Sequence, residues 1–265
     1  MVGNTVAGNL DAVGLRIDID GPVATVTLAA PDRRNAQTPA TWKALAEIGR
    51  SLPGSVRAVV LRAEGPSFCA GLDRRIFAGE PVDGAPSVAE MAALSPRELE
   101  DLIETFQAGF TWWRRPDLVS VAAVHGHAVG AGFQLALACD MRVVTEDAQF
   151  AMRETSLGLV PDLGGTLPLV DIVGYPRALE ICLTGRWVDA TEAGALGLAE
   201  LVVPNDQLDA AVGDLLAPIL AAPRDAVIET KALLVQARTR ALGEQLAEER
   251  QAQARRLRDL AGVGE

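Results

Sequence analysis

The chain has 265 residues, 49% of them hydrophobic and 22% charged, with a formal net charge of −11 at pH 7. This length and composition suit one large domain with a buried core, or a domain with an appendage, and exclude a disordered or fibrous protein. The acidic balance excludes the basic surface that neutralises nucleic-acid phosphates, so no nucleic-acid partner is expected.

The cysteine pattern argues against a disulfide framework or a zinc site. Cys69, Cys139 and Cys182 are odd in number, widely spaced and lack a CxxC pair. We therefore expect buried thiols in a reducing cytosol. The first ten residues also lack the basic stretch and apolar run of a signal peptide, so a cytoplasmic protein is expected.

The N-terminal part of the chain alternates strand and helix signals. Residues 15–20 and 23–29 predict a hairpin, because Val, Ile and Thr alternate around a DGP turn. Thr38 followed by proline is typical of a helix start. Residues 56–62 (VRAVVLR) predict a strand covered on both faces, which leads into a turn-rich segment at 66–73.

The middle of the chain begins with a loop and a capped helix. Residues 78–86 are rich in Pro and Gly and predict an irregular loop, and the capping box SPRE at 95–98 begins an amphipathic helix that runs to about Arg115. Residues 118–139 are uncharged and long enough to cross a membrane. Their polar residues and three glycines instead favour a strand at 119–124, a glycine turn and a buried helix.

The remaining elements complete an α/β order followed by helices. Short strands at 141–145 and 150–152 continue the alternation of strands and helices, which predicts an α/β fold. Beyond them, apolar residues recur at helical spacing with a break at Ala222-Pro223. We expect a core domain over residues 1–205 and a C-terminal helical region over residues 206–265 that serves assembly and covers the active site.

Three segments contain glycine turns or carboxyl residues in a suggestive order: Phe68–Asp73 (FCAGLD), His125–Gln134 (HGHAVGAGFQ) and Gln149–Thr166 (QFAMRETSLGLVPDLGGT). Taken singly, the first two are typical of tight turns. Together with RRNA at 33–36 and TGR at 184–186, they resemble the crotonase (enoyl-CoA hydratase/isomerase) superfamily. The resemblance covers roughly residues 15–240.

This resemblance implies a fold, an assembly and a substrate class. The fold is a spiral of ββα units forming two roughly perpendicular sheets wrapped by helices, and the assembly is a homotrimer or a dimer of trimers. The substrate is an acyl-CoA thioester, and no metal or redox cofactor is needed. His125 and His127 are an i, i+2 pair without an acidic or Cys partner nearby, which is poor spacing for metal ligands, so we expect packed polar residues.

The chemistry of a thioester enolate requires two hydrogen-bond donors aimed at the carbonyl oxygen as charge develops there. By resemblance, these donors are the backbone N–H groups of Ala70 and Ala131, the second at the start of a helix. The family usually has Gly where this chain has Ala131. Because only the amide is used, we expect the function to survive this difference.

Two carboxylates activate water in the family's hydratases, and this chain has one of them. The first falls on Gln134, whose amide cannot exchange a proton near neutral pH but can orient water or substrate. The second falls on Glu154, which as an isolated residue could equally be a surface group or a helix cap. Hydration by the two-glutamate route is therefore not expected to be efficient.

Asp162 follows Glu154 by eight residues, a spacing that resembles the family's dienoyl-CoA isomerases. One carboxylate can remove a proton while the other delivers a proton to a distant carbon. Those isomerases also have Asp at the position of Gln134, so the match is partial. The alternative reading of Asp162 is a cap for the helix that begins near Gly165.

Coenzyme A is anionic, so an acidic protein must provide local positive charge. Candidate cations are Arg33, Arg34, Arg74, Arg75 and Lys231. By resemblance, the substrate-binding residues are Arg33, Arg34, Ala36, Gly71, Leu72, Asp73 and Gly130, which border the nucleotide, the pantetheine and the thioester. Trp112 and Trp113 are interpreted as core or subunit-contact residues, with a place in the acyl pocket as the alternative.

The favoured function is isomerisation of the double bond of an enoyl- or dienoyl-CoA, with Glu154 and Asp162 as acid/base groups. One alternative is an enoyl-CoA hydratase of low or altered activity, as in fatty-acid β-oxidation, that uses Glu154 alone. The other is a non-catalytic acyl-CoA-binding protein. Asp162 discriminates, because a protein that only binds has no need for a buried carboxylate facing Glu154.

Overall fold

The computed structural model describes residues 10–80, 82 and 86–263, and in this part it contains two sheets. The larger sheet has six strands in the order β1-β2-β3-β4-β6-β9, and the smaller has three in the order β5-β7-β8. Their bounds are β1 Leu15–Asp20, β2 Val23–Leu28, β3 Ala58–Ala63, β4 Val119–Val124, β5 His127–Val129, β6 Met141–Thr145, β7 Gln149–Ala151, β8 Val188–Asp189 and β9 Leu201–Val203.

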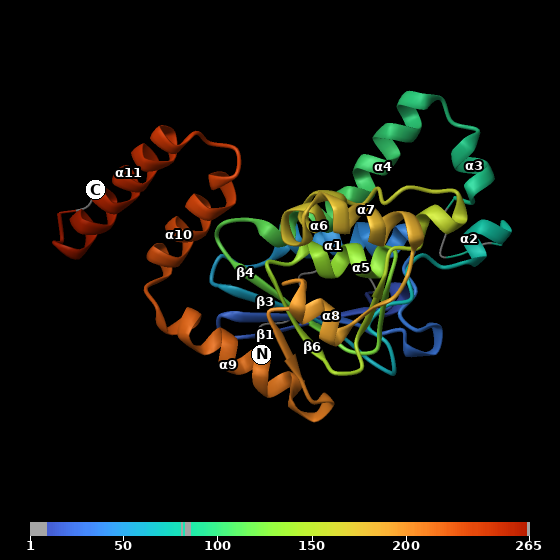
Figure 1. The fold of residues 1–265 in the computed structure, drawn as a ribbon, viewed down its shortest axis with the longest axis horizontal. Helices are drawn as coiled ribbons and strands as arrows, with labels where there is room; N and C mark the ends of the chain where they lie inside the picture. The colour runs from blue at the N-terminus through green and yellow to red at the C-terminus, as the bar shows by residue number, and fades with distance from the viewer. Residues whose placement is uncertain (1–9, 81, 83–85, 264–265) are drawn as a thin grey trace.

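The helices surround these sheets (Figure 1). The longer ones are α1 Pro39–Ser51, α4 Pro96–Thr111, α5 Ala131–Ala138, α6 Thr166–Val173, α7 Tyr175–Thr184, α9 Leu208–Ala221, α10 Arg224–Ala237 and α11 Leu242–Leu260. Shorter ones are α2 Arg75–Ala78, α3 Val88–Ala92 and α8 Ala190–Ala195, with 3₁₀ turns that include η3 Trp112–Arg114 and η4 Glu154–Leu157. This arrangement confirms the predicted α/β class with a helical C-terminal region.

The predicted N-terminal hairpin is confirmed. β1 and β2 pair antiparallel from Leu15↔Leu28 to Asp20↔Val23, and Gly21 closes the turn at φ +54°. Thr38 caps α1 as expected, since its side chain accepts from the Thr41 amide. β3 begins two residues later than predicted, because the Val56 amide bonds to Pro53 in a turn.

The parallel strands of the larger sheet are covered on both faces, as their apolar runs require. α1, α4 and α5 lie on one face, and α9 lies on the other (Figure 1). Val212 and Leu216 of α9 pack against Val121 and Val143 of the sheet. Residues 118–139 form strands and a short buried helix, and no helix in the described part of the chain is both long and apolar enough to span a membrane.

The smaller sheet brings the three motifs together. β5 was not predicted, and Cys69 bridges to its Ala128 through bonds from the Cys69 amide to His127 (2.8 Å) and from the Val129 amide to Cys69 (2.9 Å). This contact needs Gly126, at φ +57°, because a Cβ there would lie 2.3 Å from the Pro66 carbonyl oxygen. The FCAGLD segment therefore lies directly against the glycine turn that precedes α5.

The C-terminal helices divide into two roles. α9 is part of the core described above, whereas α10 and α11 extend away from the sheets as a helical pair (Figure 1). Residues 238–241 separate α10 from α11, and this second interruption between the C-terminal helices was not predicted. Lys231 anchors α10 by donating to Asp140 Oδ2 and to the Leu118 carbonyl, both at 2.6 Å.

The tryptophan pair, the cysteines and the loop at 78–86 can also be compared with the predictions. Trp113 is fully buried and stacks on Trp112 at 4.0 Å, so the pair belongs to the core. Cys69 and Cys139 are buried free thiols, whereas Cys182 is only partly buried. The predicted loop at 78–86 includes α2's last residue at Ala78, and its positions 81 and 83–85 lie outside the described residues.

Candidate active site

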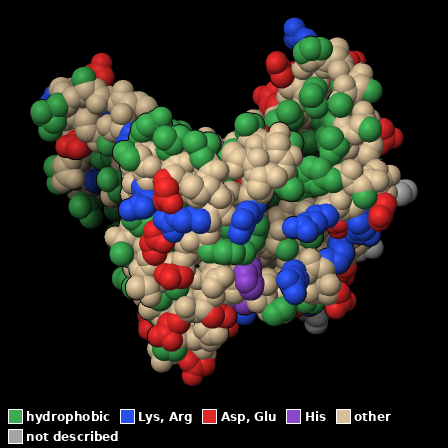
Figure 2. Space-filling model, turned by 45° about the vertical axis from the view of Figure 1, so that its right-hand side comes forward, with side chains coloured by type: hydrophobic (Ala, Val, Ile, Leu, Met, Phe, Trp, Pro, Cys, Tyr) green, Lys and Arg blue, Asp and Glu red, His purple; other side chains and the backbone are tan. Residues whose placement is uncertain are grey.

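A cavity of about 660 Å³ lies where the three motifs meet. Eleven of the twelve predicted site residues line it: Arg33, Arg34, Ala36, Ala70, Gly71, Leu72, Gly130, Ala131, Gln134, Glu154 and Asp162. Figure 2 shows Lys and Arg side chains and a histidine around a hollow on this acidic protein. All its lining residues precede residue 188, so the described part of the C-terminal region does not cover it within one chain.

Asp73, Arg75 and Lys231 were expected in the site but do not line the cavity. Asp73 is only 6% exposed and does not line the cavity; instead it accepts from Arg75 Nη2 at 2.7 Å and pairs with Arg33 at 3.4 Å. The Arg75 hydrogen bonds lower the pKa of the Asp73 carboxyl. Arg75 and Lys231 also lie outside the cavity lining, whereas Arg74 is part of it. The Asp73 carboxylate therefore contacts arginines and does not line the cavity.

The backbone amide of Ala70 is not available as an oxyanion donor, which contradicts the expected role. It donates to the Arg34 carbonyl at 2.9 Å. In the parallel bridge between Gln37 and Leu72, the Gln37 amide donates to Gly71 and the Asp73 amide donates to Gln37, both at 2.8 Å. The Leu72 amide therefore faces away from Gln37, and no hydrogen bond within the described residues uses it.

The Ala131 amide lies close to this loop. Ala131 begins α5, and its N–H has no acceptor among the described residues. A Cβ on Gly71 would lie 2.7 Å from the Val129 carbonyl oxygen and 3.7 Å from the Ala131 nitrogen, so only glycine allows the two segments to approach this closely. Leu72 and Ala131 thus present two unused N–H groups from adjacent segments.

Glu154 and Asp162 line the same cavity from the segment that follows β7. Glu154 begins η4 and is 8% exposed. Burial raises its pKa, as does the negative charge of Asp162, while the hydrogen bond from Gln134 lowers it. Burial likewise raises the pKa of Asp162. The cap reading of Asp162 is wrong, since Gly165 is the N-cap of α6 and no side chain caps that helix.

Gln134 connects the two carboxyl-bearing segments. Its Nε2 donates to Glu154 Oε1 at 2.7 Å, and its Oε1 accepts from the amides of Leu163 at 2.9 Å and Gly165 at 3.3 Å. The second carboxylate oxygen of Glu154, Oε2, is buried without a partner in the described part of the protein. That oxygen is the one left for a ligand.

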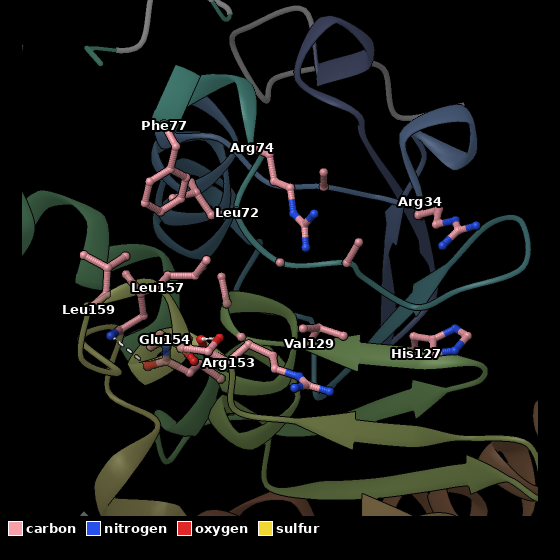
Figure 3. Close-up of a pocket in the computed structure, with 18 of the residues that line it drawn as sticks. Arg34, Leu72, Arg74, Phe77, His127, Val129, Arg153, Glu154, Leu157 and Leu159 are labelled. Carbon is pink, nitrogen blue, oxygen red and sulfur yellow. Dashed lines mark hydrogen bonds between the residues drawn. The ribbon is translucent and has the colours of Figure 1, made fainter. Parts of the chain in front are cut away.

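The two ends of the cavity differ in character (Figure 3). Leu157, Leu159 and Phe77 form an apolar wall on one side of Glu154, whereas Arg34 and His127 lie at the opposite side. The apolar end suits a hydrocarbon chain, and the arginine-lined end suits an anion.

Sequence reasoning missed several of the lining residues, among them Arg153, His127 and Trp187. Arg153 lies over the Trp187 ring at 5.1 Å, and the His127 ring contacts that tryptophan at 5.5 Å. His127 is a packed polar residue as expected, with Nδ1 3.1 Å from Ser67 Oγ, yet it also faces the cavity. The positions of Arg153 next to Glu154 and of Trp187 next to the TGR motif were the available signals.

Comparisons with known proteins agree with this geometry. The sequence profile described as enoyl-CoA hydratase/isomerase matches residues 18–259. A solved structure from Thermobifida fusca YX, provisionally named an enoyl-CoA hydratase and in complex with CoA, is 51% identical, with 96% of each chain covered and a TM-score of 0.91.

Two curated relatives carry different activity names. The human mitochondrial Δ(3,5)-Δ(2,4)-dienoyl-CoA isomerase is 33% identical over 84% of this chain and 69% of its own. The Arabidopsis thaliana protein named probable enoyl-CoA hydratase 2, mitochondrial, is 32% identical over 69% of this chain. The match spans 58% of that plant protein, which is less than two thirds of its length.

Proposed function

The chain belongs to the enoyl-CoA hydratase/isomerase family, and from this premise we propose that it isomerises the double bond of an enoyl- or dienoyl-CoA. The observation that carries the proposal is the pairing of Glu154 and Asp162 in one cavity, with an amide at Gln134 in place of a further carboxylate. Burial raises the pKa of both carboxyl groups, as is common for groups that exchange protons in an active site.

The reaction needs a base, an acid and an electron sink. Glu154 Oε2 removes a proton from an acyl carbon, and the electrons move to the thioester oxygen, which accepts hydrogen bonds from the Leu72 and Ala131 amides. Protonated Asp162 then delivers its proton to a more distant carbon as the carbonyl re-forms. Exchange with solvent then removes the proton from Glu154 and returns one to Asp162, which restores the starting state.

Binding of the CoA portion uses the positive end of the cavity. Arg34, Arg74 and Arg153 line it, and no ion pair with a carboxylate is found for these three within the described residues. Their charges attract phosphate groups despite the negative charge of the whole chain. A homotrimer or dimer of trimers and a cytoplasmic location stay predictions.

Hydration is the second candidate, and it is favoured by the name given to the 51% identical Thermobifida fusca structure.

A substrate panel separates the two reactions. The protein is incubated with 2-enoyl-, 3-enoyl- and 3,5-dienoyl-CoA esters, and products are followed by mass and ultraviolet absorbance. Isomerisation changes absorbance at constant mass, whereas hydration adds the mass of one water. Hydration of 2-enoyl-CoA as the dominant reaction would overturn the proposal.

Substitutions at Ala131 test the oxyanion site. Because the backbone N–H is the working group, Ala131→Gly is expected to retain turnover. Ala131 is only 5% exposed, so Ala131→Val crowds the thioester and is expected to cost about 3 kcal/mol, the scale of losing one oxyanion donor. Steady-state kcat/KM for both variants is the measurement, and equal values in the two variants would remove Ala131 from the site.

A further inference from the structure

We infer that Gln134 is a positioning residue that fixes which oxygen of Glu154 exchanges protons, so that substrate meets this carboxylate only through Oε2. The inference rests on the proposed acid/base role of Glu154. It holds for isomerisation and for hydration alike, and can therefore be tested apart from the choice between these reactions.

The direction of the hydrogen bonds around Gln134 is fixed by chemistry. The amides of Leu163 and Gly165 can only donate, so the side-chain atom 2.9 Å and 3.3 Å from them is the carbonyl oxygen of Gln134. The NH₂ group must then point to Glu154, where Nε2 lies 2.7 Å from Oε1. Glu154 Oε1 is thereby held as an acceptor, and a proton on this oxygen would weaken the bond.

Close packing holds the amide in this orientation. Gln134 is 1% exposed on α5. A Cβ added to Gly165 would lie 2.7 Å from Gln134 Cγ, and one added to Gly130 would lie 3.2 Å from Glu154 Oε1. The two glycines therefore leave the space that the Gln134 and Glu154 side chains occupy.

Because Gln134 engages Oε1, only the other carboxylate oxygen of Glu154 is free in the described part of the structure. Oε2 is buried without a hydrogen-bond partner among the described residues, a costly arrangement unless a ligand group or proton meets it. Since Oε1 is engaged by Gln134, proton uptake and release occur at Oε2. Gln134 also accepts from the amide of the residue after Asp162, so one side chain links the two carboxyl-bearing segments.

The experiment compares Gln134→Met with Gln107→Met. Methionine at 134 has similar length but no donor and only a weak sulfur acceptor. Gln107 is the matched control, because its amide donates to the backbone oxygen of Asp162 at 2.7 Å and no hydrogen bond links it to Glu154. The readouts are the pH titration of the Glu154 carboxyl in the substrate-free protein, by ¹³C NMR, and the kcat and KM of the acyl-CoA reaction.

Gln134→Met is expected to move the Glu154 titration to higher pH, since a donor to the charged form is lost, and to lower kcat about 10- to 100-fold with KM within about twofold. Gln134→Glu, which keeps an acceptor for Leu163 and Gly165, should titrate together with Glu154 in two steps. Unchanged Glu154 titration in Gln134→Met, or an equal shift in Gln107→Met, would overturn the inference. A shifted titration with only hydrated products would instead retain it and reject the isomerase proposal.

Discussion

Glu154→Gln is expected to lower isomerase turnover about 10²- to 10⁴-fold, the range for a positioned acid or base, with KM within about twofold. The substituted amide oxygen can still accept from Gln134 Nε2, so the geometry survives while proton exchange is lost. Turnover is measured by ultraviolet absorbance with an isomerisable enoyl- or dienoyl-CoA. Binding of CoA, measured by calorimetry, serves as the control and should be unchanged. Wild-type turnover in this variant would remove Glu154 from the chemistry.

The pH dependence gives the same residue a second signature. The base form of Glu154 must be ionised, and burial raises its pKa above the ordinary glutamate value. Wild-type kcat should therefore rise with pH through a step that lies above that ordinary value, and this step should be absent in Glu154→Gln.

Asp162→Asn is expected to lower isomerase turnover by a similar factor, about 10²- to 10⁴-fold, for a different reason. Asparagine cannot deliver the proton to the distant carbon, but Glu154 remains able to remove one. In deuterium oxide, this variant should exchange deuterium into the substrate while forming little isomer. Asp18→Asn, on the exposed part of β1, is the matched control. Undiminished isomerisation in Asp162→Asn would reduce the site to Glu154 alone.

Patterning predicted those parts of the fold that depend on local sequence or on complete burial. The predicted bounds of β4 and β6 agree with the structure, because both strands are mainly apolar, are rich in valine and lie buried in the sheet. β5 was missed because its three residues lie between glycines and form a strand only through pairing with β7 and contact with Cys69. Such pairing has no local signal.

The candidate site shows the same division. The motifs identified eleven residues that line one cavity, since the family resemblance carries residue positions. The resemblance did not predict which groups are already hydrogen-bonded within the protein. The Ala70 amide donates to the Arg34 carbonyl, and the Asp73 carboxylate accepts from Arg75. The contact of Arg153 with Trp187 joins residues distant in sequence, so no pattern predicted it.

The most direct test of the paired-carboxylate isomerase is the mass of the product formed from a 3,5-dienoyl-CoA in deuterium oxide. We expect a shifted double bond, deuterium from solvent on carbon, and no added water, because Asp162 delivers a proton that exchanges with solvent. Loss of this product in both Glu154→Gln and Asp162→Asn would complete the result. A product that carries the mass of one heavy water, formed without isomer, would contradict the account.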